Sequence, residues 1–456
     1  MAGHTELETS LKKAIRRHGV PGASIAVLKG RRVVAAAAAG VTNVDTLVPV
    51  TTDTVFQIGS ITKVFTATLA MQLVDDGLLS LDTPIIEYLP EFRVADPITR
   101  RTVTARHLLS HTSGIDGDFF PDAGRGDDSI ARLVAMSTLL PSLFPTGTKM
   151  SYCNVGFAVL GRIIEVLRRE TFDQAMRRRI FKPLGMTHAM TLPEDALRYR
   201  CAVGHVPHPK HAGQAIVAPS MYLSHGQKSA GSTPSMSAPD LLKFVLAHLE
   251  HGRIRGSQQL LSAASAAAMQ RRQIRLQKHA PRGAIGWGLG WFLCGWSGHR
   301  MIGHDGGTLG QYSFLRASPD KRTAVALLTN GGDAIGLYKA MFDPLFESAI
   351  RRHEPELPPP DPALRIDSAR YVGRYENIAA TYSIDQHRGV LRVSVRPKGE
   401  LGATLEAAPL VFIDRETAVL RTGNPIVDRS SLLFSDARDG RYGFVQIGFR
   451  QFGRVD

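Results

Sequence analysis

The sequence has few cysteines and lacks long hydrophobic runs. Its three cysteines, Cys153, Cys201 and Cys294, are spread over 456 residues, a pattern that gives neither a disulfide framework nor a zinc site. No run of about 18 apolar residues occurs, so we expect no membrane span. The N-terminal stretch MAGHTELETSLKKAIRRHG reads as a polar amphipathic helix and lacks the apolar core of a signal peptide. We therefore expect a cytoplasmic protein.

Acidic residues are scarce relative to basic ones. The chain carries 55 lysines and arginines against 41 acidic residues, a formal net charge of +14. Its basic clusters, such as Arg177–Arg179 and Arg271-Arg272, are short, scattered and free of interleaved aromatics. Such clusters indicate a solvated surface and not a nucleic-acid footprint. The possibility of an acidic partner protein stays open, because the net charge alone does not identify a partner.

Histidines give no metal-binding pattern. His205, His208 and His211 recur every three residues in HVPHPKHAG, but prolines break a shared helix face and no acid or cysteine completes a ligand set. We expect a solvated loop there, and neither a metal site nor a cofactor in the chain. We expect three tryptophans to pack near a sheet edge: Trp287, Trp291 and Trp296. One of them is a candidate for the lining of an acyl pocket.

The order of strand-like and helical segments predicts an α/β fold. Residues 22–40 read as a β-hairpin, and strand character returns from IGWGLGWFL to TAVALLTNGG, residues 285–332. Between them, roughly residues 82–285 are helical and rich in loops, and a closing helix follows residue 333. We expect the strands of both ends to pair into one antiparallel sheet, with the helical middle as a second lobe. A cleft between two lobes is a common place for a site.

A proline-rich stretch divides the chain. EPELPPPDPALRID predicts a stiff linker at residues 355–366, after a first domain of residues 1–354. Residues 367–456 then show short alternating segments separated by turn residues. Strands this short and regular predict a small antiparallel β-barrel.

The stretch FQIGSITKVFTA, residues 56–67, places an amine within an apolar run. Helical spacing begins at Ser60 and runs to about Asp76, so Ser60 and Lys63 lie one turn apart on one face. A serine hydroxyl needs a base to become a nucleophile, and a buried, neutral lysine can be that base. The alternative is a helix-capping serine beside a lysine whose amine reaches solvent.

Two further segments carry groups that could complete such a site. Tyr152 and Asn154 precede a helix, where a phenol can move protons and an amide can hold an amine or a carbonyl. His304, Gly306 and Gly307 lie on a predicted strand, and an exposed backbone N–H there could stabilise an oxyanion. The alternatives are a buried tyrosine with a capping asparagine, and a β-bulge with a surface histidine.

Five ordered motifs resemble one family. They are Ser60-x-x-Lys63, HLLSHTSGI at residues 107–115, Tyr152-x-Asn154, IFKPLGM at residues 180–186 and His304-x-Gly306. Over about residues 10–350 the chain resembles the class C β-lactamase-like serine hydrolases and penicillin-binding proteins, which include D,D-peptidases, D-aminopeptidases, esterases and acyltransferases. The resemblance implies a β-lactamase/transpeptidase-like fold, an antiparallel sheet flanked by helices with a helical lobe.

The resemblance also implies roles for these residues. Ser60 would attack a carbonyl, and Lys63 would take its proton and stay hydrogen-bonded to Tyr152. Tyr152 would protonate the leaving group and then activate the second nucleophile. Asn154 would orient Lys63 and the substrate amide. The oxyanion would lie between the backbone N–H groups of Ser60 and Gly307.

His304 departs from the family pattern, since many members carry the lysine of a K-T-G motif there. That lysine binds the carboxylate of penicillins, so a histidine puts β-lactamase activity in doubt. Histidine is more usual in the esterase, aminopeptidase and transferase branches. Gly306, in the same motif, is expected to line the substrate site.

A catalytic domain followed by a lipocalin-like barrel resembles two groups, the D-aminopeptidase relatives and the penicillin-binding-protein-type thioesterases. The second group releases and cyclises non-ribosomal peptides held as thioesters by an acidic carrier protein. Its barrel can lend a basic residue to the cleft, for which Arg450 and Arg454 are candidates; the alternative is two surface arginines. Three readings of function follow: a peptide-cyclising thioesterase, a stand-alone esterase or D-aminopeptidase-like hydrolase, and a non-catalytic ligand sensor.

Overall fold

The computed structural model describes residues 4–456 except 212, 255, 297, 352, 400–403, 424–427 and 429. Its centre is an eight-stranded antiparallel sheet with the order β2-β1-β13-β12-β11-β10-β9-β8. The N-terminal strand β1 pairs with β13 from the far end of the first domain, with Ile25 opposite Leu327. The predicted pairing of the two ends is therefore confirmed. The strands are β1 (Gly22–Lys29), β2 (Arg32–Gly40), β8 (Ile274–Arg275), β9 (Ala284–Trp287), β10 (Phe292–Trp296), β11 (His299–Gly307), β12 (Tyr312–Ser318) and β13 (Thr323–Thr329).

Helices cover both faces of this sheet. The terminal helices α1 (His4–Arg17) and α11 (Ala334–Ile350) share one hydrophobic cluster with the sheet, and α2 (Thr62–Asp75) and α9 (Ala238–Leu249) share the other. The helix α2 is buried along almost its whole length, Lys63 included. A helix that is buried all round belongs to a core. The apolar run that contains Lys63 is therefore inside the protein.

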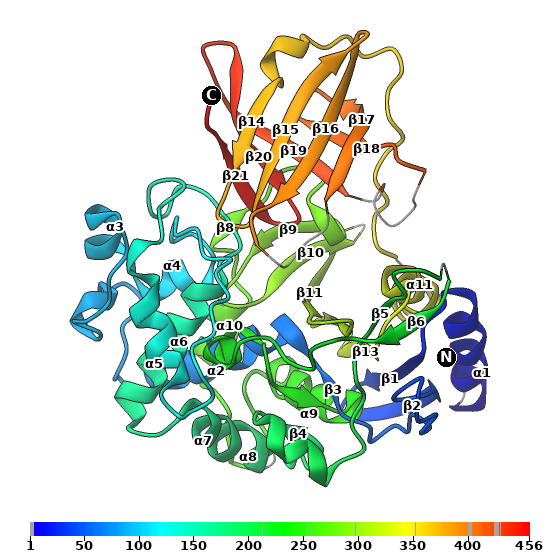
Figure 1. Cartoon of the computed structure of the whole chain (residues 1–456). Coiled ribbons are helices and arrows are strands. Elements are labelled where there is room, and N and C mark those ends of the chain that lie inside the picture. The colour runs from blue at the N-terminus through cyan, green and yellow to red at the C-terminus, as the bar shows by residue number, and fades with distance from the viewer. Residues whose placement is uncertain are drawn as a thin grey trace.

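The helical lobe lies beside the sheet (Figure 1). It is built from α3 (Pro97–Thr102), α4 (Ala105–Leu109), α5 (Ser129–Met136), α6 (Asn154–Arg168), α7 (Phe172–Met176), α8 (Lys182–Leu184) and α10 (Ala263–Met269). Two small sheets accompany the main sheet: β3 (Phe56–Gln57), β7 (Ser235–Met236) and β4 (Ala189–Met190), and β5 (His205–Pro207) with β6 (Ala215–Val217). The first domain also contains short 3-10 or π turns: η1 (Gly59–Ile61), η2 (Ile85–Glu87), η3 (Ser137–Leu139), η4 (Arg177–Phe181), η5 (Pro193–Arg198), η6 (His225–Ala230) and η7 (Pro281–Gly283).

The C-terminal part is a closed eight-stranded barrel that stands above the β8–β10 edge of the main sheet (Figure 1). Each strand pairs with the next, and β14 closes the barrel against β21. The predicted barrel is therefore confirmed, while the limits of the linker at residues 355–366 stay a prediction. The elements are η8 (Ser368–Arg370), β14 (Gly373–Glu376), β15 (Ala380–His387), β16 (Val390–Pro397), β17 (Leu405–Asp414), β18 (Thr417–Leu420), β19 (Ser431–Arg438), β20 (Arg441–Ile447) and β21 (Arg450–Arg454).

Hydrogen bonds join the barrel to the first domain. The Ile378 amide donates to the Asp116 carboxylate over 2.6 Å, and the Lys149 ammonium lies 2.6 Å from Asp436. The Tyr152 amide donates to the Phe449 carbonyl over 2.8 Å. Tyr152 is one of the predicted site residues, so the barrel touches the candidate site itself.

The structure corrects two details of the sequence analysis. The stretch IGWGLGWFL forms two strands, β9 and β10, because the chain turns at Gly290, which has a φ of +88°. His205 does not lie in a solvated loop. It is buried in β5, where its Nδ1 donates to the Asn330 carbonyl over 2.8 Å and its Nε2 accepts from the Val44 amide over 3.1 Å.

None of the helices in the described part of the chain has the length and apolar character that crossing a bilayer requires. Among the same residues, no cluster of three or more histidine, cysteine or acidic side chains could hold a metal ion.

Candidate active site

Lys63 is fully buried, and its amine is directed at the Ser60 hydroxyl. Its Nζ lies 3.0 Å from Ser60 Oγ and donates to the Ala230 carbonyl over 2.6 Å. Burial lowers the pKa of Lys63 well below its ordinary value, and the nearby Arg450 cation lowers it further. A neutral amine at this distance can accept the hydroxyl hydrogen of Ser60. The lysine does not reach solvent, so the alternative reading of this pair is wrong.

Close backbone contacts at two glycines fix the position of Ser60. A Cβ at Gly59 would lie 2.6 Å from the Gly307 amide nitrogen, and Gly59 has a φ of +50°. Gly231 follows Ala230, whose carbonyl accepts from Lys63. A Cβ at Gly231 would lie 2.1 Å from the Gly59 carbonyl oxygen. A side chain is thus excluded at Gly59 and Gly231, and the Gly307 amide is held against Gly59, the residue before Ser60. The two backbone donors predicted for the oxyanion lie at neighbouring positions.

Tyr152 is buried beside this pair. Lys63 Nζ lies 4.8 Å from the centre of its ring, and the phenol oxygen has no hydrogen-bond partner among the described residues. Burial raises the pKa of Tyr152, while the nearby Ser60 hydroxyl opposes the shift. The phenol is therefore protonated near neutral pH and can donate a proton. The expected bond between Lys63 and Tyr152 is replaced by the bonds of Lys63 to Ser60 and Ala230.

His111 supports Tyr152, a role that the sequence analysis missed. Its imidazole stacks on the Tyr152 ring with the ring centres 4.3 Å apart, and its Nδ1 accepts from the Cys153 amide over 3.0 Å. Burial, reinforced by Lys63, lowers the pKa of His111 well below its ordinary value. The residue lies within the HTSGI motif, which was recognised, but the motif alone did not show what the ring touches.

Asp118, also missed, links Asn154 to the barrel. The Asn154 amide nitrogen donates to Asp118 over 2.6 Å, and the Arg450 guanidinium donates to both carboxylate oxygens. The guanidinium carbon of Arg450 lies 5.0 Å from the centre of the Tyr152 ring. Among the hydrogen bonds of the described residues, none joins Asn154 to Lys63, in contrast to the expected orientation. Instead, Asp118 fixes Asn154 and brings Arg450 into the site.

Arg454 lies outside the site, so the prediction that it reaches the cleft is not supported. Its guanidinium donates to the Val372 carbonyl over 2.7 Å and to the Tyr375 hydroxyl over 2.7 Å, both within the barrel. The reason is the strand itself, because four residues of β21 separate Arg454 from Arg450 by about 13 Å.

His304 is buried, so it is not a surface histidine. Its Nδ1 donates to the Asp305 carbonyl over 2.7 Å, which leaves Nε2 as an acceptor with no described partner. Burial, and next the nearby Lys63, lower the pKa of His304 to about 3. The imidazole is therefore neutral where a K-T-G lysine would carry a charge. At Gly306, a Cβ would lie 1.9 Å from the Ile58 carbonyl oxygen, so only glycine allows β11 to approach this closely.

Trp287 closes the cluster on the side of the sheet. Its ring centre lies 5.9 Å from that of Tyr152 and 5.7 Å from that of His304. The other two tryptophans are packed elsewhere, Trp291 against His248 and Trp296 against Phe346. Of the three, Trp287 is the one that borders the candidate site.

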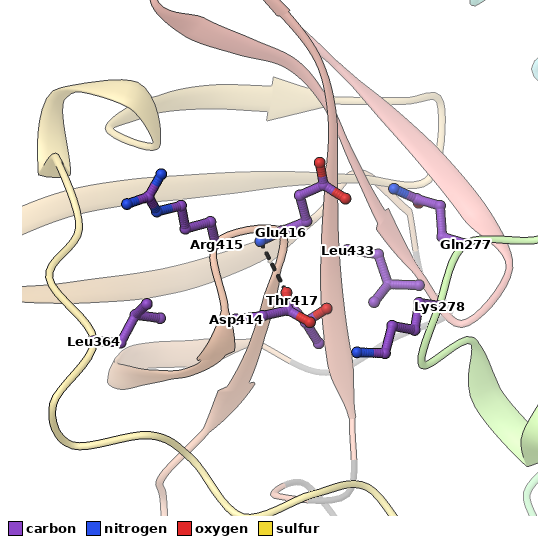
Figure 2. A pocket seen from close by; sticks show the side chains of 8 residues that line it. All are labelled: Gln277, Lys278, Leu364, Asp414, Arg415, Glu416, Thr417 and Leu433. Atoms are coloured by element: carbon purple, nitrogen blue, oxygen red, sulfur yellow. Dashed lines mark hydrogen bonds between the residues drawn. The ribbon is translucent and has the colours of Figure 1, made fainter.

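Two hollows lie between the barrel and the first domain. The smaller, of about 390 Å³, is framed by Lys278 and the turn that carries Asp414 and Glu416, and none of the predicted site residues lines it (Figure 2). The larger cavity measures about 1080 Å³. Asp305 and Phe449 both line the larger one, so it borders the back of the strand that carries His304.

Comparisons with known proteins agree with this geometry. Residues 7–347 match the family model described as Beta-lactamase. "Penicillin-binding protein 4" of Amycolatopsis lactamdurans is 43% identical over 369 residues, which cover 79% of this chain and 94% of that protein.

Solved structures extend the similarity to the barrel. The structure of SurE is 28% identical with a TM-score of 0.80 and covers 99% of both chains, and its complex with D-Leu gives a TM-score of 0.76. D-amino acid amidase from Ochrobactrum anthropi SV3 is 25% identical with a TM-score of 0.59, over 72% of this chain and 90% of that one. With the buried serine–lysine pair, the tyrosine and the glycine-flanked backbone donors in place, the chain belongs to the beta-lactamase family.

Proposed function

We propose that the protein is a serine acyl-transfer enzyme that forms an acyl-enzyme on Ser60. The observation that carries the proposal is the buried Lys63 amine 3.0 Å from Ser60 Oγ, with a pKa lowered by burial. A serine in a non-catalytic sensor does not need an unprotonated base within hydrogen-bond distance. The proposal is therefore an enzyme and not a binding scaffold.

Four groups would carry the reaction. Ser60 Oγ attacks the carbonyl carbon of an ester, thioester or amide, and its proton passes to Lys63 Nζ. The oxygen of the tetrahedral intermediate takes the negative charge and faces the backbone N–H groups of Ser60 and Gly307. As the bond to the leaving group breaks, the Tyr152 hydroxyl gives that group a proton and regains one from Lys63. Water or an amine then repeats these steps in reverse order and releases the acyl group.

The cations and neutral groups around Ser60 indicate the kind of acyl donor. His304 is neutral, so it offers no charge to a penicillin carboxylate, whereas Arg450 places a guanidinium next to Tyr152. We propose that Arg450 and Asn154 bind the polar end of a substrate whose reacting residue has the D configuration. The similarity to D-amino acid amidase and to SurE, which has been crystallised with D-Leu, supports this stereochemistry.

Our narrowest proposal is a penicillin-binding-protein-type thioesterase that releases and cyclises a peptide from an acidic carrier protein. The two-part architecture supports it, because a catalytic domain followed by a barrel resembles this group of thioesterases. The structure of SurE, which has both parts, matches the chain over its whole length. The net charge of +14 fits an acidic carrier. The second candidate is a hydrolase of D-amino acid amides or esters, which the similarity to D-amino acid amidase favours.

A short peptidyl thioester with a C-terminal D-residue tests the proposal. We expect intact-mass spectrometry to show an acyl adduct that Ser60→Ala lacks, and chromatography to show a cyclic product. A linear product alone would favour the hydrolase. If thioesters, activated esters and D-amino acid amides all fail to give an adduct, the protein is not an acyl-transfer enzyme.

A further inference from the structure

The turn between β20 and β21 has an aromatic residue in a conformation that normally requires glycine. Ile447 pairs with Arg450, so Gly448 and Phe449 form a two-residue loop. Both have positive φ values, +54° and +73°. Glycine, asparagine and aspartate dominate such turns because a side chain strains the left-handed backbone. A phenylalanine that keeps this conformation indicates a task for its ring.

Backbone hydrogen bonds hold this turn against the segment that carries Tyr152. The Phe449 carbonyl accepts from the Tyr152 amide over 2.8 Å. The Gln451 amide donates to Ser151 Oγ over 3.0 Å, and its side chain donates to the Met150 carbonyl over 3.2 Å. The ring of Phe449 is therefore at a fixed place beside the candidate site.

The ring covers the aromatic cluster around His304. Its centre lies 5.4 Å from that of Trp287, at an interplanar angle of 78°, and 6.3 Å from that of Phe292. Trp287 and Phe292 each contact His304, with ring centres 5.7 Å and 5.9 Å apart. Phe449 is thus the outer layer of the cluster that buries the imidazole.

The same residue also lines the interdomain cavity of about 1080 Å³. Charged side chains such as Arg282, Asp305 and Glu354 line that cavity as well, so it is suited to water. Phe449 therefore contacts both this cavity and the cluster of Trp287 and His304.

We propose that Phe449 is the water barrier of the acyl-enzyme: its ring keeps water of the interdomain cavity away from the Tyr152–His304 cluster and so favours an acceptor other than water. This inference rests on the proposed acyl-transfer function. Exclusion of water is a known way to protect a reactive intermediate from hydrolysis. The barrel would therefore influence which nucleophile completes the reaction.

Phe449→Gly tests the role of the ring, because it removes the side chain, keeps the carbonyl that holds Tyr152 and relieves the positive-φ strain. We expect acylation of Ser60 to change less than twofold and hydrolysis of the acyl-enzyme to become about threefold faster or more. Phe449→Leu should be intermediate. Phe444→Ala is the matched control, since Phe444 lies on the same hairpin but packs against Phe144 and should leave both rates unchanged.

The adduct on Ser60, followed by intact mass after acylation with an activated ester, gives both rates. Unchanged or slower hydrolysis in Phe449→Gly, with acylation intact, would overturn the role of Phe449 alone. A wild-type protein that never forms an adduct would overturn the proposed function, and this role with it.

Discussion

Replacing Asp118 by asparagine tests whether the carboxylate that joins the two domains also prepares the site. The side chain of Asp118 is 10% exposed and that of Arg450 is 35% exposed. Asparagine has nearly the same shape and can still accept from Asn154, but it removes the charge that holds the guanidinium over Tyr152. The change therefore isolates the ion pair.

The structure sets the size of the expected effect. A hydrogen bond to a charged group contributes about 1.5–3 kcal/mol, and solvent at the partly exposed arginine reduces this to about 1.5 kcal/mol. Because about 1.4 kcal/mol is a factor of ten, we expect kcat/KM to fall about tenfold in Asp118→Asn. Asp127→Asn, an exposed aspartate of the same loop region, should have no effect.

The assay is a double-mutant cycle with Arg450→Ala, in which kcat/KM is measured on one thioester or activated ester. If Asp118 acts by holding Arg450, Asp118→Asn should cost almost nothing once the arginine is gone. Equal losses in both backgrounds, or no loss in the wild-type background, would refute the reasoning.

Three further predictions concern other parts of the site. Tyr152→Phe should lower turnover by about 10²-fold or more without lowering the melting temperature, because the phenol oxygen has no described partner to lose; a variant as active as the wild type would remove Tyr152 from the mechanism. Burial raises the pKa of Asp116 from 3.8 to about 7, so the folded state keeps a proton that the unfolded state loses, and stability should fall as pH rises through that window. Thermal melts at pH 5 and pH 8 should therefore show a smaller difference for Asp116→Asn than for the wild type, and an equal difference would contradict the shift. Gly306→Ala should abolish acylation, because its Cβ would lie 1.9 Å from the Ile58 carbonyl oxygen; an adduct formed at the wild-type rate would show that β11 need not approach so closely.

The parts of the site that depend on local spacing were predictable from the sequence. Ser60 and Lys63 lie one helical turn apart, and their proximity follows from helix geometry alone. The pairing of β1 with β13 followed from strand character at both ends. The barrel followed from the regular alternation of short segments after the linker.

Contacts between distant segments were not predictable in the same way. Asp118 meets Arg450 across 332 positions of the chain, and no periodicity in either segment indicates that contact. For the same reason Arg450 and Arg454, four residues apart on one strand, looked equivalent in the sequence, although only the first reaches the site. Phe449 could have been noticed as a bulky residue after glycine in a hairpin turn, but its neighbours depend on the docking of the barrel.

The backbone bonds between the β20–β21 turn and the Tyr152 segment bear on how proteins of this architecture can be recombined. A chimera that exchanges barrels between relatives at the linker would separate Phe449 from its native partner Tyr152, and Arg450 from its native partner Asp118. Grafts that move residues 447–451 together with Asp118 and residues 150–152 would keep those bonds matched. If Phe449 acts as proposed, acceptor choice depends on residues of both domains, and chimeras should exchange those residues together.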